Sequence, residues 1–444
     1  MIVIIGGGPA GISAALAAAE NGAQIILIES SSRLGGQYWR HKQGQNFSIG
    51  NSLTAHSQVE VLLNAHVWHA SYKAGKTTLN VIVNGKERII ETKSLIMATG
   101  AYDRSLPFPG WNLPGVMTPG GAQALLKGSG VGFGKKVVVA GTGPFLLPVA
   151  TGLAQAGVNV IGFYEANSIS AWMPHLPQLI LNPSKLREAF RYAIMLRKYH
   201  IKQKRKWTVV AAHADSQGKL ARVTIAKIDR NFRIRNSREI DCDCLAIGWG
   251  FTSDLSLANN LGVQQEMSLV DQSMFVRVDK SQKTNLPGVF AAGEITGIGG
   301  WQLSVTEGRI AGLAATDRSA SKLLLRRFVQ RSFATALIKS YPVMGGWQSW
   351  LNDETIICRC EEVSLAKIKY TIHELGAEDA RTVKLLARPG MGMCQGRICG
   401  RCVVDVVASE SGQSPTIQDR IGLSSRPIVT PVPLSILAVS ERIE

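Results

Sequence analysis

The sequence lacks any apolar run of the roughly 18 to 20 residues that a membrane-spanning helix requires. Its first residues, MIVII, meet glycines at once with no basic region before them, so the pattern predicts neither a signal peptide nor a membrane span. Cysteine is also scarce, with seven in 444 residues, mostly near one end. That odd, clustered set argues against a secreted disulfide framework and favours thiolate metal ligation in a reducing cytoplasm.

Acidic residues are few relative to basic ones, with 32 Asp and Glu against 49 Lys and Arg, a formal charge of +17 and a pI near 9.7. Much of the excess lies in residues 185–206, KLREAFRYAIMLRKYHIKQKRK, where apolar residues recur at helical spacing. This predicts a surface helix with a solvated basic face. The alternative is a docking surface for an acidic partner or for the inner membrane, on which the protein would be peripheral. No recognition motif or stacking platform supports nucleic-acid binding.

The hydrophobic content of 45% is enough for several globular cores, and the first of them begins with a glycine loop. After the apolar residues 3–5, GGGPAG places Gly6, Gly8 and Gly11 before the helix-forming run ISAALAAAENGA. The glycines allow a tight turn, close backbone approach to a pyrophosphate and helix packing on the strand. A second strand, QIILIE, ends at Glu29, where a carboxylate accepts the hydroxyls of an adenosine ribose. The stretch therefore predicts a bound dinucleotide.

A second loop repeats the design in KKVVVAGTGPFLLPVATGLAQAGVNVIGFYEA. Gly141 and Gly143 fit, and Glu165 ends the second strand, but Leu146 stands at the third glycine position. We expect Leu146 to force helix and strand apart, and Pro148 to remove a helical hydrogen bond. Three alternatives stay open for this site: a mononucleotide such as ATP or ADP, weakly held NAD, or a structural remnant. NADP is disfavoured because Glu165 would repel its 2′-phosphate.

Two further segments, SLIMATG and LPGVFAAGEITGIGGWQLSVTEGRIAG, each run from a buried strand into a glycine turn. With the two loops, they resemble the two-dinucleotide-binding-domain flavoproteins, which include glutathione-reductase-like enzymes. The resemblance implies an α/β fold with two Rossmann-type units and FAD in the first. It also implies that Glu294, where most members carry Asp, contacts the ribityl or pyrophosphate region, and that a helix starting near Trp301 aims its N-terminus at the flavin. The implied cofactor-binding residues are Gly6, Gly8, Pro9, Ala10, Gly11, Glu29, Gly36, Gln37, Ala98, Thr99, Gly100, Gly293, Glu294, Trp301 and Gln302, with Gly141, Gly143 and Glu165 in the second unit.

The disulfide reductases of that class need a cysteine pair beside the flavin, and none is present in LGGQYWRHKQG. In the second unit only Cys242 and Cys244 occur, in EIDCDCLAIGWG. Two residues apart on a strand they would share one face, as buried apolar side chains. The sequence therefore excludes thiol-disulfide exchange.

The remaining thiols lie near the C-terminal end, as Cys358-x-Cys360, Cys394-x4-Cys399 and Cys402. Four thiolates in two close pairs suit a 2Fe-2S cluster, whereas zinc, the alternative, is more often held by C-x2-C knuckles. The helices expected around them are LAKIKYTIHEL, capped by Ser364, then ARTVKLLA, then GRCVVDVVASE, whose start would stabilise thiolate charge.

This segment resembles the bacterioferritin-associated-ferredoxin-like 2Fe-2S domain, and GMGMCQGRICG matches the variant fused to amine-oxidising flavoproteins. The resemblance implies Cys358, Cys360, Cys394 and Cys399 as cluster ligands and leaves Cys402 as a spare.

Over nearly its whole length, the chain resembles the alpha-type subunit of heteromeric amino-acid and opine dehydrogenases. This family includes opine oxidases, D-hydroxyproline dehydrogenases and hydrogen cyanide synthases. The specific part of the resemblance is AYDRSLPFPGW joined to GMGMCQGRICG. The resemblance implies that a D-amino-acid-oxidase-like flavoprotein beta subunit oxidises the amine or imino acid. This chain would relay the electrons through FAD and the cluster in a hetero-oligomer, in some members with an FMN between the subunits and a small ferredoxin-like subunit. Arg40, Tyr102 and Arg104 are interpreted as surface or flavin-edge residues, so the sequence identifies no catalytic residue.

Two other functions remain open: a self-contained NADH-dependent flavin and cluster reductase, against which Leu146 argues, and a structural or cluster-carrying subunit. The predicted domains are an FAD domain of residues 1–110 and 250–335, a degenerate nucleotide-binding domain of 111–249, a cluster domain of 350–410 and an extended tail of 411–444. A linker containing YPVMGGWQSW precedes the cluster domain.

Overall fold

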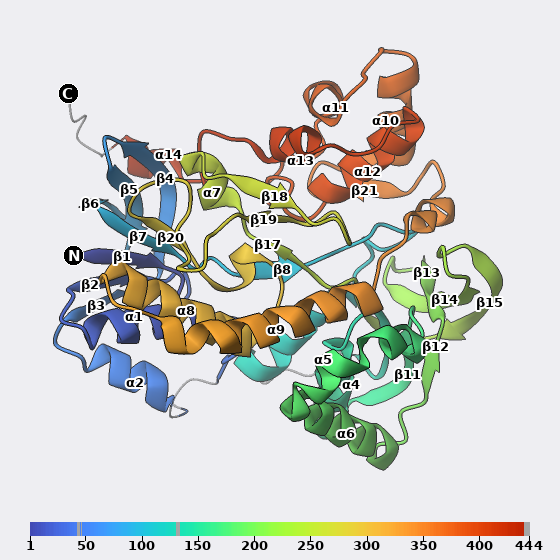
Figure 1. Ribbon diagram of the computed structural model, residues 1–444. Coiled ribbons are helices and arrows are strands. Elements are labelled where there is room, and N and C mark those ends of the chain that lie inside the picture. The colour runs from blue at the N-terminus through green and yellow to red at the C-terminus, as the bar shows by residue number, and fades with distance from the viewer. Residues whose placement is uncertain (42–44, 46, 130–133, 439–444) are drawn as a thin grey trace. The chain divides into compact units, whose positions relative to one another are not determined.

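The computed structural model describes residues 1–41, 45, 47–129 and 134–438 (Figure 1). Two compact units make up the chain: Met1–Tyr102, Thr252–Thr335 and Ser425–Glu444 form the first, and Asp103–Phe251 and Ala336–Ser424 form the second. Residues 439–444 of the predicted tail lie outside the described part. Each unit contains a five-stranded parallel sheet, so the expected α/β class with parallel sheets is confirmed. The predicted limits of the FAD, nucleotide and cluster domains stay a prediction.

The sheet of the first unit has the strand order β20-β7-β1-β2-β3, and every neighbouring pair is parallel. Its inner strands are short and buried at nearly every position, as expected where both faces of a parallel sheet are covered. The strands are β1 (Ile2–Ile5), β2 (Ile25–Ile28), β3 (Val59–Leu62), β7 (Ser94–Met97) and β20 (Val289–Ala291).

Alternating side chains of β1 enter two different cores. Ile2 and Ile4 pack with helices α1 (Pro9–Ala19) and α8 (Trp301–Ala315). Val3 and Ile5 pack on the other face, with an antiparallel sheet of β4 (Ala65–Lys73), β5 (Lys76–Val83) and β6 (Lys86–Thr92) and with α7 (Ser256–Leu261). Helices α1 and α8 approach closely because Gly308 lacks a Cβ, which would lie 2.1 Å from the Ala10 carbonyl oxygen. This face of the sheet carries the first glycine loop.

The other elements of the first unit are short, apart from α9, which continues into the second unit. The sequence predicts an extended tail from residue 411 onward. Residues 417–424 form a helix, α13, so the prediction of an extended tail is wrong there. Farther on, the Val429 N–H donates to the Trp68 carbonyl at 2.7 Å. The other elements of the first unit are α2 (Ser48–Thr54), β8 (Ala101–Asp103), β17 (Phe251–Ser253), β18 (Gln265–Met267), β19 (Met274–Val276), η3 (Gly293–Thr296), α9 (Ser321–Ser340) and α14 (Leu434–Leu437).

The second unit repeats the parallel arrangement, with the strand order β12-β11-β10-β16-β9, and adds an antiparallel sheet β13-β14-β15. Its elements before residue 251 are β9 (Val116–Met117), α3 (Pro119–Ala124), η1 (Leu125–Ser129), β10 (Lys136–Gly141), α4 (Leu146–Gln155), β11 (Asn159–Glu165), η2 (Ile169–His175), α5 (Leu176–Ile180), α6 (Pro183–Lys198), β12 (Gln203–Arg205), β13 (Trp207–Ala214), β14 (Leu220–Ile228), β15 (Ile234–Asp241) and β16 (Cys244–Gly248).

The C-terminal part of the second unit shares one hydrophobic core with this sheet. The segment predicted as a linker belongs to that core, because Trp347 and Trp350 are buried and the Trp350 indole N–H donates to the Phe232 carbonyl at 2.8 Å. Ser364 caps α10 as predicted, and the other two expected helices are confirmed as α11 and α12. The elements are η4 (Gly345–Trp350), β21 (Ile356–Cys358), β22 (Val363–Ser364), α10 (Leu365–His373), α11 (Ala380–Ala387), α12 (Gly400–Glu410) and α13 (Ile417–Ser424). Among the residues that the structure describes, no helix has the length and apolarity to cross a bilayer.

Candidate functional site

The first glycine loop joins β1 to α1 and tolerates no side chain at two of its glycines. Gly6 has a φ of +108°, and a Cβ there would lie 2.2 Å from the Ala98 carbonyl oxygen. A Cβ on Gly11 would lie 1.8 Å from the Gly6 carbonyl oxygen. Gly8 is the N-cap of α1, Pro9 follows at its start, and no side chain caps the helix. The N–H groups of the first turn are therefore left for an anionic ligand.

Glu29 is held at the edge of this loop. Its side chain is 8% exposed; Oε2 accepts a hydrogen bond from the Gly7 N–H at 2.6 Å, and Oε1 accepts one from the Ser31 N–H at 2.7 Å. These bonds fix the carboxylate immediately after β2, beside the backbone that would contact a pyrophosphate. This is the arrangement expected of an acid that binds a ribose.

Three other predicted segments lie at the same edge of the sheet, because β2, β1, β7 and β20 are parallel neighbours. Ala98, Thr99 and Gly100 follow β7, and the Thr99 hydroxyl donates to the Asp254 carbonyl at 2.8 Å. Gly36 packs on the glycine loop so closely that a Cβ would lie 2.8 Å from the Gly8 Cα. The Gln37 side chain is bound by Arg40.

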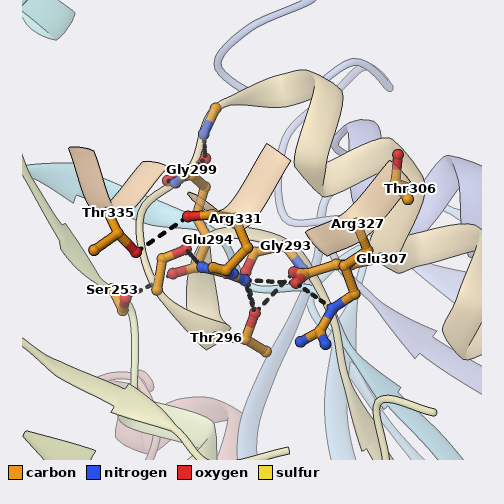
Figure 2. Close-up of polar contacts among 12 residues, drawn as sticks. Ser253, Gly293, Glu294, Thr296, Gly299, Thr306, Glu307, Arg327, Arg331 and Thr335 are labelled. Carbon is orange, nitrogen blue, oxygen red and sulfur yellow. Dashed lines mark hydrogen bonds and ion pairs between the residues drawn. The ribbon is translucent and has the colours of Figure 1, made fainter. Parts of the chain in front are cut away.

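Glu294 comes after β20 and turns toward the loop before α8 (Figure 2). Its carboxylate accepts hydrogen bonds from the Gly300 N–H at 2.7 Å and the Gly299 N–H at 3.4 Å. Burial raises the pKa of Glu294, while these N–H groups and nearby Arg331 oppose the rise. The side chain therefore binds the backbone of the loop that leads into α8.

A buried ion-pair network, which the sequence reasoning missed, holds the Gly293 turn in place (Figure 2). Glu307, on α8, has no exposed side-chain surface, and its Oε1 binds Arg327 Nε at 2.9 Å and an Arg331 guanidinium nitrogen at 2.5 Å. Its Oε2 accepts from the Thr296 hydroxyl at 2.8 Å and the Gly293 N–H at 3.2 Å. The only sequence signal was an acid in the stretch SVTEGRIAG. One carboxylate thus joins α9 to the turn after β20.

Aromatic side chains gather where α8 begins. Trp301 is the first residue of α8, as predicted, and Gln302 is the second. The Trp301 ring stacks on Tyr38, with centroids 5.3 Å apart and planes 20° apart, and lies 6.1 Å from the Trp39 ring. Tyr38 and Trp39 were not predicted to take part, although YW follows GGQ in the sequence. Stacked rings of this kind offer a planar apolar wall.

The second glycine loop has a tight turn like that of the first, but the helix that follows it begins later. Gly141 has a φ of +118°, and a Cβ there would lie 1.8 Å from the Gly248 carbonyl oxygen. Helix α4 begins at Leu146, the position that corresponds to Gly11, whereas α1 begins at Pro9. Leu146 is 1% exposed and packs in the core. The protein accommodates this side chain because α4 starts later than α1 does. Fewer helical N–H groups therefore point into the loop.

One sequence-based expectation about this loop is wrong, that for Pro148, whereas Glu165 ends β11 as expected. Pro148 is the third residue of α4, where the N–H has no intrahelical partner, so it removes no helical hydrogen bond. Glu165 is 2% exposed and accepts from the Thr142 hydroxyl at 2.7 Å and the Gly143 N–H at 3.0 Å. Burial raises the pKa of Glu165 to about 7 against these hydrogen bonds. The acid is in place for a ribose, but the phosphate cradle is weakened.

Four thiols gather around one cavity in the second unit. Cys358, Cys360, Cys394 and Cys399 line a cavity of 230 Å³ together with apolar and aromatic side chains. Hydrogen-bonding contacts link Cys399 to Cys358 and to Cys394, and Cys394 to Cys360. These contacts and backbone N–H groups lower the pKa of Cys358 to about 6 and that of Cys394 to about 5, whereas the pKa of Cys399 is raised. Thiolate character is therefore favoured at this place.

The other cysteines point elsewhere. Cys402 is 1% exposed, its thiol donates to the Ser105 carbonyl at 3.2 Å, and burial raises its pKa to about 12. Cys242 and Cys244 are buried as expected, but in two different cores, because Cys242 precedes β16. The prediction that they share one strand face is wrong.

The donor chemistry of the four thiols fits an iron-sulfur cluster, since such clusters are held by four thiolates. The backbone also contributes, since the Gly390 N–H donates to the Cys358 sulfur at 3.4 Å, and hydrogen bonds to the sulfurs help to tune such clusters. As they stand, however, no three His, Cys, Asp or Glu side chains in the described ranges have the arrangement of a metal site. The thiols contact one another, so a cluster would have to separate them.

Comparison with known proteins places the chain in a family. Residues 1–308 match the family of pyridine nucleotide-disulphide oxidoreductases. The chain is 31% identical to hydrogen cyanide synthase subunit HcnB of Pseudomonas protegens, over 90% of each protein. It is 30% identical to the A subunit of opine oxidase from Agrobacterium tumefaciens, over 98% of this chain and 91% of that one. The structure of L-proline dehydrogenase from P. horikoshii is similar in fold, with a TM-score of 0.66 at 22% identity, over 98% of this chain and 78% of that one.

Proposed function

Since the chain belongs to the pyridine nucleotide-disulphide oxidoreductase family and to the group that includes HcnB and the opine oxidase relative, which makes it a FAD-dependent oxidoreductase, we propose that it is the electron-relaying subunit of a heteromeric dehydrogenase. Its substrate would be an amino acid, imino acid or opine, oxidised by a D-amino-acid-oxidase-like beta subunit. Both relatives are named as subunits, which supports a hetero-oligomer. The same proposal includes an FMN between subunits and a small ferredoxin-like subunit.

The observation that carries the proposal is the combination of a complete dinucleotide loop in one unit with four thiols around one cavity in the other. Bound FAD would supply two-electron chemistry and a 2Fe-2S cluster one-electron chemistry, the combination that a relay needs. In the first unit, Gly6, Gly8 and Gly11 would admit the pyrophosphate and Glu29 would bind the ribose. Glu307 would keep the Gly293 turn in register through its four hydrogen bonds.

In the second unit, Cys358, Cys360, Cys394 and Cys399 would hold the cluster, with Cys399 at the N-cap of α12, where the helix favours negative charge. The second nucleotide site would hold a mononucleotide such as ATP or ADP, or NAD weakly, through Gly141, Gly143 and Glu165. The late start of α4 leaves fewer N–H groups for the phosphates of either ligand.

The test is co-purification with the product of the neighbouring gene, followed by anaerobic addition of proline, hydroxyproline, sarcosine and opines. We expect one of these to bleach the flavin of this chain and to produce a reduced-cluster signal only when the partner is present. A self-contained NADH reductase would instead be reduced by NADH alone, at a rate comparable to turnover. A structural or cluster-carrying subunit would be reduced by neither, and either result would overturn the proposal.

A further inference from the structure

Exposed apolar side chains are concentrated in the second unit on η2, α5 and α6. In this unit, η2 contacts α5 and α5 contacts α6; Figure 1 labels the two α-helices. We call this surface the apolar-basic face. Five of its apolar side chains are more than 60% exposed, and all eight are large. Single exposed apolar residues are ordinary, but a continuous group on one set of elements marks an interaction surface. The group consists of Ile169, Met173, Leu176, Ile180, Leu181, Leu186, Phe190 and Ile194.

Helix α6 shows that this exposure is not a by-product of core packing. Its buried side faces α4 and contributes Leu196 to the core. Leu186, Phe190 and Ile194 are spaced four residues apart, on the solvent side, and are 44%, 69% and 53% exposed. At 100° per residue they form a stripe along the outer surface of the helix. The fold therefore leaves an apolar face without a partner within the described residues of its unit.

Basic side chains border this stripe. Arg187, Arg191 and Lys198 are exposed, and at 100° per residue they fall on one flank of it. The only acid between residues 176 and 206 is Glu188, which pairs with Lys185 at 2.9 Å. The bases of α6 are Lys185, Arg187, Arg191, Arg197 and Lys198.

We propose that the apolar-basic face binds the surface of an anionic phospholipid bilayer, with α6 lying in the interface plane. Leu186, Phe190 and Ile194 would enter the boundary between headgroups and acyl chains, and the flanking bases would contact lipid phosphates. Lysine is depleted in the cores of protein–protein interfaces, whereas an apolar stripe bordered by Lys and Arg is typical of interfacial helices. The inference is independent of the proposed function, because it uses no cofactor and no residue of either candidate site.

Sedimentation of the full-length protein with vesicles tests this proposal. We expect binding to vesicles that contain phosphatidylglycerol and little binding to pure phosphatidylcholine, with the difference reduced by high salt. Arg187→Gln with Arg191→Gln should weaken binding by about fivefold per charge removed. Phe190→Ser with Ile194→Ser should weaken it at least tenfold, because each apolar side chain contributes roughly a factor of ten when fully inserted.

The matched control is Leu325→Ser with Phe328→Ser on α9, where the two side chains are 74% and 71% exposed in the first unit. This variant should bind vesicles like the wild type, and circular dichroism should show all variants folded. Absence of binding to anionic vesicles, or equal losses in the control and the α6 variants, would overturn the proposal. If the wild type bound no vesicles and the Phe190→Ser, Ile194→Ser variant lost the partner subunit, the face would be assigned to a protein instead.

Discussion

Replacing Glu307 by Gln tests how the buried network supports the flavin site. Gln has nearly the same shape, but its amide presents donors at one end and an acceptor at the other. The Glu307 oxygens face donors on both sides: Arg327 and Arg331 on one, Thr296 and Gly293 on the other. In Glu307→Gln, one pair of donors must therefore face the amide NH₂ group, and both arginines lose their counter-charge.

The expected cost follows from burial. Removing one partner of a buried ion pair costs about 3–5 kcal/mol. The Arg327 and Arg331 side chains are 21% and 27% exposed, so water relieves part of that cost and we take about 3 kcal/mol. At roughly 2–4 °C per kcal/mol for a unit of this size, the Tm of the first unit should fall by about 6–12 °C. The two arginines, as the charged donors, should keep the amide oxygen, which leaves the Gly293 N–H without its acceptor, so the variant should also lose flavin.

Differential scanning calorimetry and flavin absorbance after gel filtration provide the measurements. The matched control is Glu266→Gln, which removes the 3.2 Å ion pair with Arg277 in the same unit, where the side chains are 45% and 58% exposed. An exposed pair of this kind contributes less than about 1 kcal/mol. If Glu307→Gln melts within about 2 °C of the control and retains its flavin, the network has no role in holding the turn.

Three further predictions concern single residues. The raised pKa of Glu165 gives the second unit stability that is present below pH 4.5 and lost as pH rises through about 7. Urea titrations should show that the free energy of unfolding falls by about 3 kcal/mol over that range in the wild type but not in Glu165→Gln. The same pH dependence in both proteins would contradict this. Gly11→Ala should abolish flavin binding, because its Cβ would lie 1.8 Å from a backbone oxygen, whereas Gly422→Ala, with open space around the new Cβ, should keep a full complement by absorbance. Iron content should drop below half in Cys399→Ser and stay full in Cys402→Ser; the reverse would move the fourth ligand to Cys402.

The sequence was most informative where a local rule decides the structure. The start of α8 at Trp301, the cap of α10 at Ser364 and the extent of α12 all follow from glycine turns, a capping hydroxyl and apolar periodicity, which act within a few residues. The parallel sheets follow from the alternation of strands and helices.

What the sequence did not indicate depends on contacts between distant segments. Glu307 appears as one acid in an apolar helix, and only the fold brings Arg327 and Arg331 to it. The Gly and Ser neighbours of Trp347 favour a linker, yet the core of the second unit encloses its side chain. Pro148 was expected to disturb α4, but Leu146 shifts the helix start to a place where that proline is harmless.

Elemental analysis and electron paramagnetic resonance of anaerobically purified protein test the central claim most directly. The account predicts two iron and two labile sulfide per FAD, and a reduced-cluster signal that rises as the flavin of the same chain is titrated with electrons. Stoichiometric zinc without iron or sulfide, or no paramagnetic signal after full chemical reduction, would contradict it.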